Sequence, residues 1–84
     1  MLKVRDESNY QLGQQARLWE NGQCYLVNIV NNLCDTKCIA YEITISRTLK
    51  YFPNKVIRRP GDHIRIFKSI SQDNHAPFFL ESIE

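Results

Sequence analysis

The chain has 84 residues, with 11 Lys and Arg against 9 Asp and Glu, which gives a formal net charge of +2. This length suits one small domain, and a domain of this size buries only about 60% of its unfolded surface. No apolar run reaches the roughly eighteen residues of a membrane span, and the first ten residues lack the apolar segment of a signal peptide. We therefore expect a single cytoplasmic domain over residues 1–84 with no membrane contact, in which residues 1–8 form a loose tail or an edge strand.

Residues 12–45 hold the clearest structural pattern, which predicts three successive antiparallel strands. The dipeptide Asn21-Gly22 separates two extended runs, and it is the strongest short-range hairpin signal because both residues tolerate a positive φ. The flanking strands are predicted at 14–19 and 24–30. A helix over 8–19 is the alternative, since Ser8 and Gln11 have a capping-box spacing, although Gly13 would lie inside it.

The third strand is predicted over residues 38–46. Apolar and polar residues alternate strictly there, which places one face on a core. The apolar positions are Ile39, Tyr41, Ile43 and Ile45.

The second half of the chain is less regular. Residues 47–63 contain turn signals at Pro53 and Pro60, with a short strand predicted between them at 55–58. A strand over 64–70 follows, in which Lys68 is the one polar residue on the apolar face. Residues 71–76 are predicted to be a loop, and 78–83 a last strand. Five or six short strands of this spacing predict an all-β fold, either a small barrel or a sandwich.

Part of the chain resembles a known family. Gly13 precedes the first strand, Trp19 lies near its end, an acidic-x-Gly turn follows, and Tyr25 opens the next strand. This pattern resembles the opening hairpin of Tudor and related SH3-like barrels. The resemblance covers residues 12–45 and implies a small SH3-like barrel of five or six antiparallel strands.

Tudor domains hold methylated Arg or Lys in a cage of aromatic rings, whose faces attract a desolvated cation. The resemblance implies that Trp19 and Tyr25 match two cage positions. The other two positions fall near Glu42 and Ile45, which are not aromatic. Trp19 and Tyr25 are therefore candidate partner-binding residues, and the alternative is ordinary packing at the rim of a barrel.

The charges are distributed unevenly along the chain. Residues 47–68 hold seven basic residues and one acid, a net charge of +6. Lys and Arg neutralise phosphates, and nearby aromatic rings can stack on bases, so this segment suits nucleic acid; an acidic protein surface is the other suitable partner. The predicted nucleic-acid-binding residues are Arg47, Lys50, Tyr51, Lys55, Arg58, Arg59, Arg65 and Lys68. The alternative is that these charges only solvate an ordinary surface.

The cysteines do not indicate a metal centre or a disulfide framework. Cys24, Cys34 and Cys38 are odd in number and lack the spacing of a zinc site, so we expect free thiols, with no metal and no cofactor.

We predict a non-catalytic binding module whose main partner is nucleic acid. The sequence contains no phosphate-binding loop, dinucleotide fingerprint or nucleophile motif. Two other functions remain open. One is a protein–protein adaptor that uses Trp19 and Tyr25 or an open strand edge, and spare edges also permit a homodimer. The other is a small ribonuclease in which His63 and His75 act as acid and base.

Overall fold

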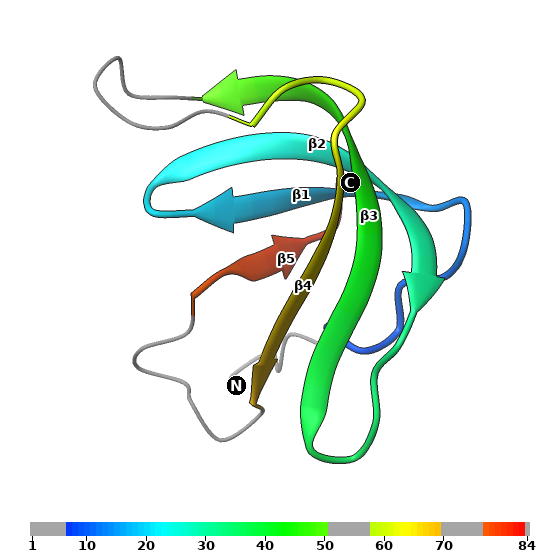
Figure 1. The fold of residues 1–84 in the computed structure, drawn as a ribbon. Helices are drawn as coiled ribbons and strands as arrows, with labels where there is room; N and C mark the ends of the chain where they lie inside the picture. The colour runs from blue at the N-terminus through cyan, green and yellow to red at the C-terminus, as the bar shows by residue number, and fades with distance from the viewer. Residues whose placement is uncertain (1–6, 51–57, 70–76, 84) are drawn as a thin grey trace.

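The computed structural model describes residues 7–50, 58–69 and 77–83, which form one curled antiparallel sheet (Figure 1). Its strands are β1 (Gln15–Glu20), β2 (Gln23–Asn32), β3 (Cys38–Lys50), β4 (His63–Ser69) and β5 (Phe79–Glu81). They pair in the order β4-β3-β2-β1-β5. The predicted all-β class is confirmed: the sheet curls into a half-barrel that is compatible with an SH3-like barrel. Within the described ranges, no helix has the length and apolar character needed to cross a membrane.

The first hairpin forms where the sequence predicted it. Glu20 pairs with Gln23, so the connection is the two residues Asn21 and Gly22, with φ of 52° and 81°. Positive φ at both positions matches the twist of the flanking strands and is what Asn-Gly accommodates. The alternative of a helix over 8–19 is wrong, because Gln15–Glu20 is a strand paired on both sides.

β3 is longer than predicted and runs on to Lys50. The pairing of β2 with β3 shifts register at three places, between Cys24 and Tyr25, between Leu26 and Val27, and between Ile29 and Asn31. Each shift adds a residue to one strand, which bends the pair and increases its twist. The bends allow two long strands to wrap around the core, as Figure 1 shows for β2 and β3.

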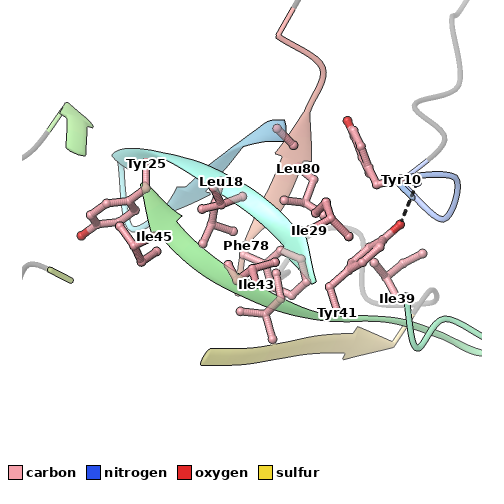
Figure 2. Packing of buried hydrophobic residues seen from close by; sticks show 13 residues of the cluster. Tyr10, Leu18, Tyr25, Ile29, Ile39, Tyr41, Ile43, Ile45, Phe78 and Leu80 are labelled. Carbon is pink, nitrogen blue, oxygen red and sulfur yellow. Dashed lines mark hydrogen bonds between the residues drawn. The ribbon is translucent and has the colours of Figure 1, made fainter. Parts of the chain in front are cut away.

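The core lies on the inner face of the curl (Figure 2). Leu18, Val27 and Leu80 are fully buried, and they come from β1, β2 and β5. The alternation predicted for the third strand is confirmed, with its four apolar positions at 0–6% exposure. Those positions are Ile39, Tyr41, Ile43 and Ile45. Tyr10, before β1, packs edge-on against Tyr41 at a ring-centroid distance of 6.1 Å.

The two outer strands of the sheet, β4 and β5, are joined by an ion pair. Lys68 on β4 donates to both carboxylate oxygens of Glu7, at 2.9 and 3.0 Å, and to the carbonyl of Phe78 at 2.8 Å. The Glu7 carboxylate also accepts the backbone N–H of Leu80 on β5 at 2.8 Å. Glu7 therefore bridges the side of the half-barrel where β4 and β5 face each other.

A turn fixes the start of β4. Gly61 has φ of 91°, and Arg59 N–H donates to the Asp62 carboxylate at 3.0 Å. Two backbone hydrogen bonds hold the turn on β3. Gly61 N–H donates to the carbonyl of Ile45, and Ile45 N–H donates to the carbonyl of Asp62. β4 begins one residue earlier than the predicted strand at 64–70, and β5 is shorter than the predicted strand at 78–83. The predicted strand at 55–58 and loop at 71–76 lie outside the described residues, apart from Arg58, which is not in a strand.

Candidate functional site

The predicted basic residues that the structure describes do not form one face. Lys68 points into the core and is only 8% exposed, where it pairs with Glu7 and lies 4.8 Å from the centroid of the Phe78 ring. Its ammonium is therefore part of the interior and offers no charge to a partner. Tyr51 and Lys55 lie outside the described residues.

Arg58 lies at one end of the half-barrel. Its guanidinium makes two bonds to the Glu20 carboxylate, of 2.7 and 3.0 Å, and its backbone N–H donates to the Tyr25 hydroxyl. The hydrogen bond to Glu20 raises the pKa of Arg58 above its ordinary value. A forked pair of this kind fixes the geometry of both side chains, so Arg58 orders the turn before β4. Arg59 beside it is exposed.

Arg65 lies on the outer face of β4, opposite Glu42 of β3. Arg65 and His63 both approach the Glu42 carboxylate at 3.6 Å, and Asn31 donates to it at 3.0 Å. The Asn31 hydrogen bond is the main cause that lowers the pKa of Glu42, and Arg65 and His63 lower it further. The charge of Arg65 is thus shared with a neighbouring carboxylate. His75, the proposed partner of His63 in a ribonuclease, lies outside the described residues.

Arg47 and Lys50 are exposed on the outer face of β3. Arg47 pairs with Leu26 and Lys50 with Cys24 on β2. Both β2 residues alternate with the buried Tyr25 and Val27, which places them on the side of the sheet away from the core.

Trp19 and Tyr25 lie on opposite faces of the sheet. Tyr25 pairs with Leu18 on the inner face and is 1% exposed. Trp19 pairs with Cys24 on the outer face and is half-buried. The two rings therefore do not line one surface, and the pair implied by the resemblance to a methyl-ligand cage is not assembled.

The ring beside Trp19 is instead Phe79 of β5. The two rings stack, with centroids 6.0 Å apart and planes inclined by 16°. Trp19 and Phe79 are directly opposite each other in the β1–β5 ladder. Phe79 remains 39% exposed.

Glu81 fixes the orientation of this pair. Its Oε1 accepts the Trp19 indole N–H at 3.1 Å and a guanidinium N–H of Arg17 at 3.1 Å. Arg17 also donates to the carbonyl of Ile83 at 2.9 Å. One carboxylate thereby holds an indole and a guanidinium side by side on the outer face, before any partner is present.

Two adjacent rows of residues cross the outer face of four strands, in the order β5, β1, β2 and β3. The ladder pairs give one row as Phe79, Trp19, Cys24 and Lys50, and the next as Glu81, Arg17, Leu26 and Arg47. Residues directly opposite across antiparallel strands have Cβ atoms about 4.5–5.5 Å apart. We call the group Arg17, Trp19, Arg47, Lys50 and Phe79 the aromatic–basic patch.

The patch joins residues that the sequence placed in separate hypotheses. Arg47 and Lys50 were predicted to bind nucleic acid, and Trp19 to bind a protein partner. Arg17 and Phe79 were not predicted. Arg17 has a sequence signal, because it lies two residues from Trp19 in a strand and so shares its face. Phe79 has no local signal, since its position depends on the pairing of β5 with β1.

Cys24 lies under the patch. It is 2% exposed, and burial is the main cause that raises the pKa of its thiol. All three cysteines are free thiols. Among the residues that the structure describes, no group of three or more His, Cys, Asp or Glu is arranged to hold a metal ion.

Comparisons of the chain with protein-family models, curated proteins and solved structures found no significant match. The interpretation of the patch therefore depends on its own geometry and charge.

Proposed function

We propose that this protein is a non-catalytic nucleic-acid-binding module of the SH3-like barrel class. The observation that supports it is the aromatic–basic patch, in which exposed Arg47 and Lys50 share the outer face with the stacked Trp19 and Phe79. Cations neutralise phosphates and release counterions, while rings offer faces to bases. The partner approaches the outer face of β1, β2, β3 and β5.

The direct test is binding of labelled DNA and RNA oligonucleotides by fluorescence anisotropy as salt is raised. If Arg47 and Lys50 each neutralise one phosphate, the slope of log affinity against log salt is about −1.4 for a single strand. Affinity then falls roughly 7-fold between about 50 and 200 mM salt. An affinity that does not change with salt would contradict the proposal.

A matched pair of variants locates the surface. Arg47→Glu places a negative charge in the patch, whereas Lys37→Glu makes the same change of net charge in the exposed connection before β3. Lys37 directly precedes β3, whereas Lys50 is the last residue of that strand. We expect Arg47→Glu to weaken binding and to flatten the salt slope, and Lys37→Glu to leave both nearly unchanged. Equal losses in the two variants would show that only total charge matters.

A protein adaptor is the second candidate, and Phe67 favours it. Phe67 is 65% exposed on β4, the outermost strand beside β3. Among the described strands β4 pairs with β3 alone, and the edge of a sheet next to an exposed ring suits an added strand from a partner or from a second copy. Phe67→Ser would abolish that interaction and leave oligonucleotide binding intact.

A further inference from the structure

The stacked rings indicate which form of nucleic acid the patch takes. We infer that it binds an unpaired strand, with a base stacking against the Trp19–Phe79 pair while the phosphates follow Arg47 and Lys50. This inference rests on the proposed function and adds the substrate class. Three observations support it: the geometry of the Trp19 and Phe79 rings, the width of the patch, and the charge of the patch.

The rings of Trp19 and Phe79 are nearly parallel and lie on the face of the sheet away from the core. Trp19 is half-buried, and Phe79 is 39% exposed. The bond from the Trp19 indole N–H to Glu81 fixes the tilt of the indole. A base that joins these rings meets aromatic surface that is already oriented, so little conformational entropy is lost on binding. Stacking of this kind tolerates any base, because every base has a π-face.

The width of the patch separates single strands from duplexes. It extends over β5, β1, β2 and β3, and strands in a sheet lie about 4.8 Å apart, so it is about 14 Å wide between the outermost strands. The major groove of B-DNA is about 12 Å wide and admits a helix or a two-stranded ribbon. A curled sheet of four strands does not enter it. In a duplex the faces of the bases are also covered by their neighbours, so Trp19 and Phe79 gain a partner only from an unpaired base.

Charge selects nucleic acid over an apolar occupant. Lys50 lies in the same row as the two rings, and Arg17 and Arg47 lie in the next row. The only carboxylate in these two rows, Glu81, is paired with Arg17. An apolar peptide would leave the cations of the patch beside apolar surface, whereas a sugar–phosphate backbone supplies a negative group every nucleotide.

The experiment compares two probes at fixed salt, a twelve-nucleotide oligothymidylate and a twelve-base-pair duplex. The chain has a single tryptophan, so its fluorescence reports on the patch directly. We expect the single strand to quench Trp19 and the duplex to bind more weakly without quenching. Phe79→Leu removes the ring but keeps apolar volume, and we expect it to weaken single-strand binding about 5- to 150-fold, the range of one lost stack. Phe79→Tyr keeps a ring and should retain binding.

The outcomes separate this inference from the proposed function. Equal affinity for both probes, with no effect of Phe79→Leu but a loss with Arg47→Glu, overturns the single-strand inference and leaves nucleic-acid binding standing. Binding of neither probe overturns both. Trp19 fluorescence that changes with protein concentration alone, and no longer does so in Phe79→Leu, shows that a second copy occupies the patch and also overturns the inference. Circular dichroism of each variant checks that the sheet is intact.

Discussion

Replacing Glu7 by Leu tests whether one buried ion pair joins the two outer strands of the half-barrel. The Glu7 and Lys68 side chains are 15% and 8% exposed, with Lys68 Nζ 2.9 Å from Glu7 Oε1. The carboxylate also accepts the N–H of Leu80 at 2.8 Å. Among the described residues, Glu7→Leu leaves the Lys68 ammonium in the interior with the carbonyl and ring of Phe78 as partners, and it removes the carboxylate that accepts the Leu80 N–H.

The expected loss is large relative to the stability of the domain. Removing one member of a buried ion pair costs about 3–5 kcal/mol. At about 0.05–0.15 kcal/mol per residue, the free energy of unfolding of an 84-residue domain is about 4–13 kcal/mol. Glu7→Leu therefore removes from about a quarter of this free energy to all of it. Glu7→Gln keeps an oxygen acceptor for Leu80 and Lys68, so its cost is smaller, about 1–3 kcal/mol.

Urea unfolding, followed by Trp19 fluorescence and by circular dichroism, measures both losses. Glu42→Gln is the matched control, because Glu42 meets His63 and Arg65 at 3.6 Å on the outer face, where solvent screens the charges. We expect its midpoint to move less than that of Glu7→Gln. The double variant Glu7→Leu with Lys68→Met should recover much of the loss, since it no longer buries an unpaired charge. If Glu7→Leu unfolds no more readily than Glu42→Gln, Glu7 does not join β4 to β5.

Two further predictions concern the first turn and a buried tyrosine. Gly22→Ala should cost about 1–2 kcal/mol in urea unfolding because φ is 81° at that position, and Asn21→Gly, at φ of 52°, should cost less. Burial, helped by a hydrogen bond with Cys34, raises the pKa of Tyr41 above its ordinary value of about 10. The contribution of Tyr41 to the free energy of unfolding is then full below about pH 10 and falls above it, because the tyrosine hydroxyl loses its proton first in the unfolded chain. Tyr41→Phe should flatten this alkaline fall in urea midpoints measured from about pH 8 to 11, and an unchanged slope would contradict the assignment.

The fold was predictable where local pattern and turn chemistry agree. Asn21-Gly22 predicted a hairpin, and the alternation through Ile39 to Ile45 predicted one buried face, and both are confirmed. These signals are local, because they depend on positive φ and on a period of two residues. The alternative of a helix at 8–19 stayed open on the sequence alone, and it is the pairing of β1 with β2 and β5 that excludes it.

The burial of Lys68 and its pairing with an acid were not predictable, because a sequence does not show which acidic residue lies beside which basic residue. Counting charges over residues 47–68 assigned Lys68 to a basic surface. The structure pairs it with Glu7, which is 61 residues away in the chain. Arg58 likewise pairs with Glu20. Lys68 was nevertheless the one polar residue on an apolar strand face. A lysine is rarely buried unless its charge is paired, so that pattern also indicates a buried ion pair.

The aromatic–basic patch depends on two register shifts in the pairing of β2 with β3, and no local sequence pattern predicts them. Strict alternation from the buried Ile45 would place Arg47 on the inner face. One extra residue in β3, Ser46, brings Arg47 opposite Leu26 instead. A second extra residue, Leu49, brings Lys50 opposite Cys24. Both cations thus reach the outer face beside Trp19 because β3 is bulged, and the same bulges that curl the sheet around its core assemble the surface that we propose for nucleic acid.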